Sequence, residues 1–174
     1  DMGFIELMTA KEIKSLCSQI MRCYASNRRS SKRFRLVLID LSEKGADEIT
    51  KYIPDWRKWG IETASNFFIQ DIPKTSQRYL SADSSAELLD LDQHAVYVLG
   101  GLVDHNRFKN VCFEKAKSHG VEAFCLPISG NVSLSGSKVL TLVNVYEILL
   151  SYLEKKSWKD ALEESIPKRK LIVK

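Results

Sequence analysis

The stretch AVYVLGGLVDHN, residues Ala95–Asn106, decides the fold of this chain. Its first five residues are a short apolar run of the kind that forms a buried strand. The glycine pair that follows, Gly100 and Gly101, lets the backbone turn sharply or approach a ligand closely. Taken alone, such a pair is more often a tight turn than a ligand site. Asp104, taken alone, more often caps the next helix than acts as a base.

Predicted strands and helices alternate on both sides of this stretch. Other short apolar runs predict strands at Phe34–Ile39, Phe67–Ile69, Tyr79–Leu80 and Val121–Leu126. Helical spacing and capping residues predict helices at 10–25, 46–58, 84–89, 108–118, 139–155 and 158–165. This alternation is typical of an α/β domain with a mainly parallel sheet flanked by helices. With 174 residues and no Pro- or Gly-rich linker, the sequence predicts a single domain over residues 1–174.

The ends of the predicted strands indicate where a ligand would bind. In open parallel sheets, ligands lie beyond the carboxyl ends of the strands. Asp40, Gly100–Asn106 and the loop 127–137 follow such ends, so we expect them near one edge of the sheet. Neither G-x-G-x-x-G nor G-x-x-x-x-G-K-S/T occurs, which excludes the usual loops that hold nucleotide phosphates.

No metal site and no membrane span are expected. The four cysteines form no C-x-x-C pair, and the three histidines share no ligand spacing. Free cysteines fit a reduced cytoplasmic or nuclear compartment. No apolar run approaches the ~20 residues of a membrane span, and the opening DMGFIELMTAKE lacks the apolar core of a signal peptide. Because the sequence opens in this way, we expect a fragment that lacks an N-terminal extension.

Positive charge is concentrated in two segments. Six basic residues and no acidic one lie between Arg22 and Arg35, and four more without an acid lie in the last nine residues. Residues 36–165 hold 14 basic and 19 acidic residues, a net charge of −5. Basic ends on an acidic body indicate a polyanionic partner, although a disordered tail and one exposed loop would give the same pattern. For Trp56 and Trp59, core packing is favoured over stacking on a nucleic-acid base.

The segment Val96–Lys109, VYVLGGLVDHNRFK, resembles a signature of the eukaryotic and archaeal tRNA guanine-N1-methyltransferases that act at position nine, a branch of the SPOUT superfamily. Five further segments match that family in order, namely Glu6–Arg29, Tyr79–Ser84, Leu126–Ile128, Lys138–Val145 and Trp158–Lys170. The match is weakest over residues 43–75. The resemblance implies a SPOUT fold whose C-terminal part is tied in a trefoil knot.

The resemblance also implies that S-adenosylmethionine binds in the loops of the knot. Carried over residue by residue, the cofactor-binding positions are Leu80, Ser81, Gly101, His105, Asn106, Arg107, Phe108, Lys109, Cys125, Leu126, Val139, Leu140 and Thr141. A side chain at Gly101 would then crowd the cofactor. The implied partner is tRNA, and basic residues expected to bind it are Arg28, Arg29, Lys32, Arg33, Lys168 and Arg169. This branch is expected to act as a monomer.

The base proposed for the family falls on Asp104, and its second acidic position falls on Asp40. Guanine N1 carries a proton that must leave during methylation, which asks for a general base. An ordinary Asp, with a pKa of ~3.9, is a weak base for this task. Asp104 is therefore interpreted as a general base or as an orienting carboxylate. Two alternatives stay open: a non-catalytic RNA-binding subunit that kept the fold, and methylation of adenine N1.

Overall fold

The computed structural model describes residues 1–69 and 72–172. Within these ranges the chain forms two sheets in which every strand pair is parallel. The first pairs β1 (Val37–Leu38) with β2 (Glu62–Thr63). In the second, β3 (Gln77–Leu80) lies between β4 (Val96–Leu99) and β5 (Glu122–Phe124). The predicted parallel α/β fold is confirmed, whereas the trefoil knot stays a prediction.

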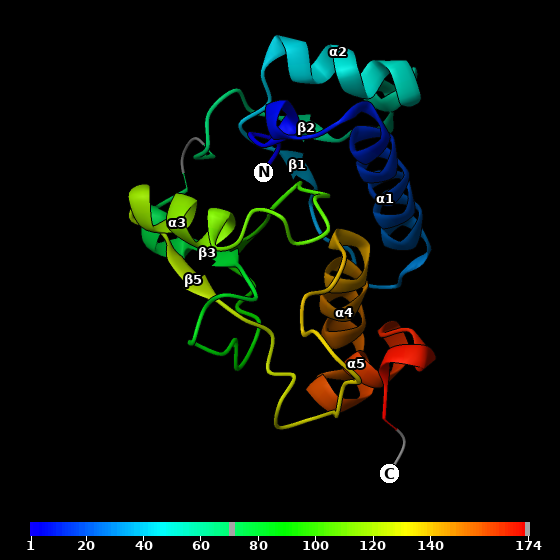
Figure 1. Cartoon of the computed structure of the whole chain (residues 1–174), viewed down its shortest axis with the longest axis vertical. Coiled ribbons are helices and arrows are strands. Elements are labelled where there is room, and N and C mark those ends of the chain that lie inside the picture. Colours follow the sequence, from blue (N-terminus) through cyan, green and yellow to red (C-terminus); the bar gives the residue numbers. More distant parts are fainter. Residues whose placement is uncertain (70–71, 173–174) are drawn as a thin grey trace.

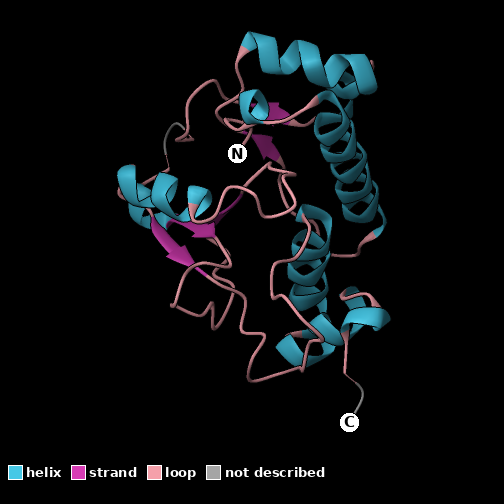
Figure 2. Cartoon of the chain, viewed as in Figure 1, coloured by secondary structure: helices cyan, strands magenta, loops and turns pink. Residues whose placement is uncertain are grey.

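Helices flank both sheets. The α-helices of the described residues are α1 (Ala10–Arg29), α2 (Glu43–Tyr52), α3 (Val111–Ser118), α4 (Leu142–Lys155) and α5 (Trp158–Ser165). Short 3-10 turns cover Ile5–Leu7, Trp56–Trp59, Lys74–Ser76 and Lys168–Lys170. Figure 1 shows α1, α4 and α5 along one side and α3 against β3 and β5 on the other. Figure 2 shows how short the strands are beside these helices. In the described residues, no helix is both long and apolar enough to cross a membrane.

Helix α1 begins at the residue that its sequence predicts. The Thr9 hydroxyl accepts a hydrogen bond from the Glu12 amide, and the Glu12 carboxylate accepts one from the Thr9 amide at 2.7 Å. Both halves of the predicted capping box therefore form. The apolar face of α1 buries Leu16 and Cys17 completely. That face packs against α2 and α4 and holds the N-terminal part of the chain in place.

Helix α4 is the buried centre of the C-terminal half. Ile148 is completely buried, and Tyr152 stacks on Trp158 of α5 with ring centroids 3.9 Å apart. The Trp158 indole N–H also donates to the carbonyl of Leu89 at 2.8 Å, which ties α5 to the segment after β3. Leu142 and Val145, near the start of α4, lie beside the carboxyl ends of β3, β4 and β5.

The prediction of a strand at Phe67–Ile69 is wrong. These residues lie in an irregular segment, and β2 instead lies at Glu62–Thr63. The Phe67 ring stacks on Tyr79 at 6.0 Å and on His119 at 4.2 Å between centroids. Its apolar character therefore reflects ring packing rather than strand pairing.

The helix predicted at 84–89 is also wrong. The Ser84 hydroxyl donates to the Ala123 carbonyl at 2.7 Å, and Glu87 forms a parallel bridge with Cys125. The segment thus follows the end of β5 instead of coiling. The helix predicted at 46–58 is interrupted, because α2 ends at Tyr52, ahead of Pro54.

Candidate functional site

A cavity of about 380 Å³ lies at the carboxyl ends of β3, β4 and β5. The last residues of these strands, Leu80, Leu99 and Phe124, all line it. The loops that leave the strands and the segment 138–145, which leads into α4, form the rest of its wall. The cavity thus lies where parallel sheets bind ligands, and its volume is in the range of small-molecule sites, about 300–1,000 Å³.

The structure brings together most of the positions predicted to bind the cofactor. Those that line the cavity are Leu80, Ser81, Asn106, Phe108, Cys125, Leu126, Val139 and Leu140. Those outside its lining are Gly101, His105, Arg107, Lys109 and Thr141. The Thr141 hydroxyl caps α4 by accepting from the Asn144 amide at 3.4 Å. Binding by any of these residues stays a prediction.

The two adjacent glycines face different surroundings. A Cβ atom at Gly100 would lie 2.5 Å from Sγ of Cys112, which also lines the cavity. A Cβ at Gly101 would lie 2.6 Å from the backbone oxygen of Asp1. In this structure the backbone of Asp1 takes the space beside Gly101, and the expected role of Gly101 in making room for a cofactor stays a prediction. Gly100 is the glycine that borders the cavity.

Asp104 lines the cavity, and both of its carboxylate oxygens are already hydrogen-bonded. One accepts from the Asn106 amide at 3.0 Å and the other from the Phe108 amide at 2.7 Å. His105 and Asn106 adopt left-handed backbone conformations, with φ of 52° and 63°. Such conformations are uncommon outside glycine and need support. Asp104 therefore holds a tight loop in the cavity wall and does not cap α3, whose N-cap residue is Asn110.

Three charged lining residues were not among the predicted site residues. Asp83 and Glu87 come from the segment after β3, and Lys138 comes from the segment before α4. Asp83 accepts from the Asn110 amide at 3.1 Å, and Lys138 donates to the Ser129 hydroxyl at 2.6 Å. Asp83 could have been found from its place just beyond a predicted strand end. With Asp104, the lining holds three carboxylates and one ammonium group.

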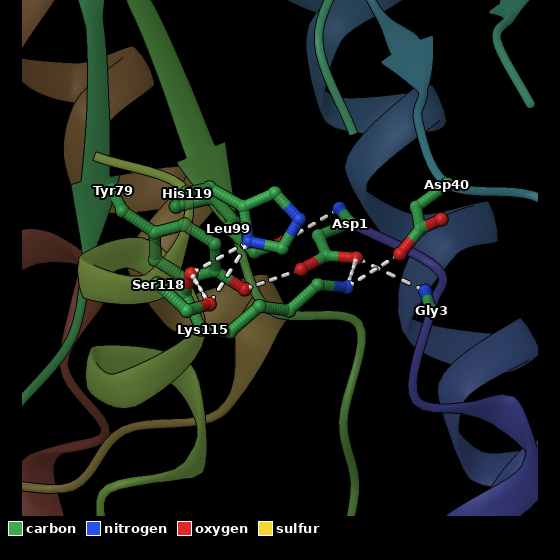
Figure 3. Close-up of polar contacts among 8 residues, drawn as sticks. All are labelled: Asp1, Gly3, Asp40, Tyr79, Leu99, Lys115, Ser118 and His119. Carbon is green, nitrogen blue, oxygen red and sulfur yellow. Dashed lines mark hydrogen bonds and ion pairs between the residues drawn. The ribbon is translucent and has the colours of Figure 1, made fainter. Parts of the chain in front are cut away.

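Asp40 lies apart from this cavity, in a network that Figure 3 shows. The Lys115 ammonium donates to the Asp40 carboxylate at 2.6 Å and to the Asp1 carboxylate at 2.7 Å. The Asp1 carboxylate is fully buried and also accepts from the Tyr79 hydroxyl at 2.7 Å. The two acidic candidates, Asp40 and Asp104, are thus not brought together on one wall.

Cys112 connects the network to the cavity. It lines the cavity, and its thiol is close to the Tyr79 hydroxyl and the Lys115 ammonium. Burial raises the pKa of this thiol and raises the pKa of the Tyr79 hydroxyl further. Both groups therefore stay protonated and neutral near neutral pH, so the network presents an uncharged thiol to the cavity wall.

The first basic segment forms an exposed loop at the end of α1. The Asn27 side chain anchors it, because it donates to the Phe34 carbonyl and accepts from the Phe34 amide, both at 2.9 Å. The Glu154 carboxylate, at the end of α4, accepts hydrogen bonds from Ser30 and Ser31 in the same loop. The basic side chains here are all exposed: Arg28 and Arg29 are the last two residues of α1, and Lys32 and Arg33 lie in the loop.

The second basic segment is the 3-10 turn Lys168–Lys170. Lys168 and Arg169 are exposed, whereas Lys170 donates to the Val139 carbonyl at 3.2 Å. The turn is tied to the loop before α4, because the Ser135 amide donates to the Lys170 carbonyl at 2.9 Å. Lys174 of the basic tail lies outside the described residues.

Comparisons with known proteins agree with this geometry. The family model described as tRNA (guanine(9)-N(1))-methyltransferase TRM10/TRM10A matches residues 1–171. The tRNA methyltransferase 10 homolog A of Mus musculus is 37% identical over 171 residues, which is 98% of this chain and 52% of that protein. The tRNA (guanine(9)-N1)-methyltransferase of Schizosaccharomyces pombe is 36% identical over 177 residues, 99% of this chain and 58% of that protein.

Solved structures give the same result. The crystal structure of full-length spTrm10 in complex with SAH matches with a TM-score of 0.83 and 32% identity, and the match covers 94% of this chain and 91% of that one. The chain spans about half the length of the curated relatives it matches. It belongs to the tRNA (guanine(9)-N(1))-methyltransferase TRM10/TRM10A family.

Proposed function

We propose that this chain transfers a methyl group from S-adenosylmethionine to N1 of guanine at position nine of tRNA. The observation that carries the proposal is the cavity at the carboxyl ends of β3, β4 and β5. Eight of the positions predicted to bind the cofactor line it. The family membership and the likeness to a relative solved with SAH support the same reading.

The lining residues fit S-adenosylmethionine. Apolar side chains such as Leu99, Phe108 and Leu140 offer surface for a purine ring and a thioether chain. The three lining carboxylates outnumber the one lysine, which favours a cationic sulfonium over a neutral or anionic ligand. No lining feature resembles a phosphate-binding loop, and this ligand carries no phosphate.

The cavity residues would position a guanine and handle its N1 proton. When bound, S-adenosylmethionine would supply a methyl group on a sulfonium, whose carbon an in-line nucleophile attacks while the neutral thioether leaves, with no need for a metal. Each Asp104 oxygen already accepts one backbone amide and has a further lone pair for a guanine N1–H. These amides fix the carboxylate in the cavity wall, so it can orient the base and accept the proton as N1 attacks.

The basic loop 28–33 would supply affinity for the RNA backbone. A base inside folded tRNA must leave its stack before it can enter a cavity, at a cost of a few kcal/mol. Contacts between Arg or Lys side chains and phosphates can offset this cost. We further propose that the chain acts as a monomer in the cytoplasm or nucleus, with Lys168 and Arg169 as additional phosphate contacts.

The experiment is mass spectrometry of nucleosides from unmodified tRNA incubated with the protein and S-adenosylmethionine. The proposal expects 1-methylguanosine, which is absent when the tRNA carries another base at position nine. Formation of 1-methyladenosine would instead assign adenine specificity. Tight tRNA binding with no methylated nucleoside, and no cofactor binding by calorimetry, would assign a non-catalytic RNA-binding role.

A further inference from the structure

The loop that carries Asp104 has an inner and an outer side. Asp104, Asn106 and Phe108 line the cavity, whereas the side chain of Arg107 lies outside the lining and is 47% exposed. The Arg107 backbone belongs to the same turn, because its amide donates to the Asp104 carbonyl at 3.1 Å. The position of Asp104 in the cavity wall therefore depends on what holds the outer side of the loop.

Arg107 connects the outer side of this loop to the start of α1. Its Nη2 atom donates to the Leu7 carbonyl at 3.2 Å and to the Glu12 carboxylate at 3.3 Å. The Glu12 side chain is only 11% exposed. Hydrogen bonds from Thr9, and a further one from Arg107, hold the pKa of the Glu12 carboxyl below its usual value, so the pair is charged near neutral pH. Because a partly buried pair is screened less than an exposed one, this contact can hold the loop at physiological salt.

A second contact holds the loop on the other side of Asp104. The Val103 amide donates to Sδ of Met8 at 3.3 Å, and the Val103 side chain packs against the core cluster that contains Met8. Val103 and Arg107 thus both contact the segment 7–12, one before and one after Asp104. Helix α1 begins in this segment and packs against α2 and α4. The anchor of the loop is therefore fixed by the core of the protein.

Arg107 also supports a residue of the cavity wall directly. Its guanidinium lies over the ring of Phe108, 4.7 Å from the ring centroid. A planar guanidinium can stack on an aromatic ring while its N–H groups donate to other partners, which an ammonium group does less well. One side chain therefore ties the loop to Glu12 and supports Phe108 at the same time.

The loop needs such support because of its backbone conformation. His105 and Asn106 are both in the left-handed region, and conformations of this kind persist only where the surrounding structure holds them. The Asp104 carboxylate bonds to the amides of Asn106 and Phe108, which lie in the loop itself. The bonds of Arg107 reach another element, so they fix the whole turn relative to the rest of the protein.

We propose that Arg107 is a positioning residue for methyl transfer, which binds Glu12 and Leu7 and so holds the Asp104 carboxylate where it meets the guanine N1–H. The inference rests on the proposed function, because it concerns the same site and reaction. The Arg107 side chain itself contacts neither cofactor nor guanine, and its effect passes through the loop. Loss of Arg107 should leave the fold in place and misplace Asp104, and a displacement of about 1 Å near reacting groups can slow a reaction ~10²-fold.

The first measurement is amide hydrogen exchange at Asn106 and Phe108, without cofactor or RNA. Arg107→Gln removes the cation, and Lys11→Gln is the matched control. Lys11 is exposed and directly precedes Glu12, and within the described residues it forms no ion pair with that carboxylate. Arg107→Gln should speed exchange of both amides at least ~10-fold relative to the parent chain and to the control, with no change in α3. If Arg107→Gln does not fold, Arg107→Lys replaces it, with a smaller change in the same direction.

The second measurement is single-turnover methyl transfer at saturating cofactor and tRNA. Arg107→Gln should slow transfer ~10-fold or more, Arg107→Lys should recover part of the rate, and Lys11→Gln should keep the parent rate. In an Asp104→Asn background, Arg107→Gln should cost less than ~3-fold further, because a residue that acts through Asp104 then has little left to change. The affinity for tRNA should stay at the parent value throughout.

Unchanged exchange at Asn106 and Phe108 in Arg107→Gln would overturn the proposal. So would equal losses of rate in the parent and Asp104→Asn backgrounds, which would give Arg107 a contact of its own with cofactor or guanine. If the parent chain methylates no tRNA, the proposed function fails, and the exchange measurement alone decides whether Arg107 holds the loop. Faster exchange then supports that role, and unchanged exchange overturns it.

Discussion

Two hollows border the carboxyl end of β4, and they differ in what their walls offer. The cavity beside β3 and β5 is walled by loops and carries three carboxylates and a lysine among apolar side chains. A second hollow of about 520 Å³, the inter-sheet groove, lies between β1 and β4 and is lined mostly by apolar residues. Gly100 lines the cavity, whereas Gly101 lines the inter-sheet groove. Scattered polar groups in an apolar wall suit a small molecule, so the cavity is the better candidate for the cofactor site.

Substitutions in the basic segment 28–33 should weaken tRNA binding without changing cofactor binding. Replacing Arg28, Arg29, Lys32 and Arg33 with Glu should weaken tRNA affinity by roughly 10³-fold or more at moderate salt and flatten its salt dependence. None of these exposed residues lines the cavity. Of the four, only Arg33 lines the inter-sheet groove. Cofactor affinity should therefore stay unchanged. Filter binding across a salt series measures the effect, and unaltered tRNA affinity would show that the loop is only solvated surface.

The substitution Asp104→Asn tests whether this carboxylate in the cavity wall takes part in methyl transfer. The Asn side chain has one oxygen, so one of the amides of Asn106 and Phe108 would face an NH₂ group instead of an acceptor. Single-turnover methyl transfer should slow roughly 10–100-fold, through loss of the proton acceptor and a looser loop. Calorimetry separates the two causes, because loss of one of the three lining carboxylates should weaken cofactor affinity only modestly, whereas loop disorder should weaken it strongly. Full activity in the variant would remove Asp104 from the mechanism.

Substitutions at the two adjacent glycines should have the smallest effects, which are changes in the free energy of unfolding. Gly100→Ala and Gly101→Ala should each cost about 1–3 kcal/mol of stability through overpacking. Adding Cys112→Ala should partly rescue Gly100→Ala, because it removes the sulfur that the new Cβ meets. It should not rescue Gly101→Ala, which meets the backbone of Asp1. A double-mutant cycle by urea unfolding measures the coupling, and equal coupling for both glycines would contradict their assignment to different hollows.

Helices and strand ends were predictable because their signals are local. The Thr9 capping box gave the start of α1, and the helix at Trp158–Ser165 is found as predicted. The rule for parallel strand ends placed the loop after β4 in the cavity wall. Phe67 shows where local signals fail, since an apolar residue that packs on distant rings is indistinguishable from one in a strand.

The buried network could not be predicted from sequence. Asp1, Asp40, Tyr79 and Lys115 come from four separate parts of the chain, and no spacing relates them. The motif that contains the glycine pair likewise does not indicate which glycine faces which hollow. That depends on the position of Asp1 and Cys112, which only the folded structure provides.

The assignment of the two hollows is tested most directly by hydrogen exchange with and without S-adenosylhomocysteine. Binding should slow exchange of amides in the segments that form the cavity wall, within residues 81–84, 104–108, 124–126, 128–129 and 138–142. Exchange at β1 and on the groove side of β4 should not change. Protection of Val37 and Tyr97 instead of the cavity loops would place the ligand between the sheets and contradict the proposed site.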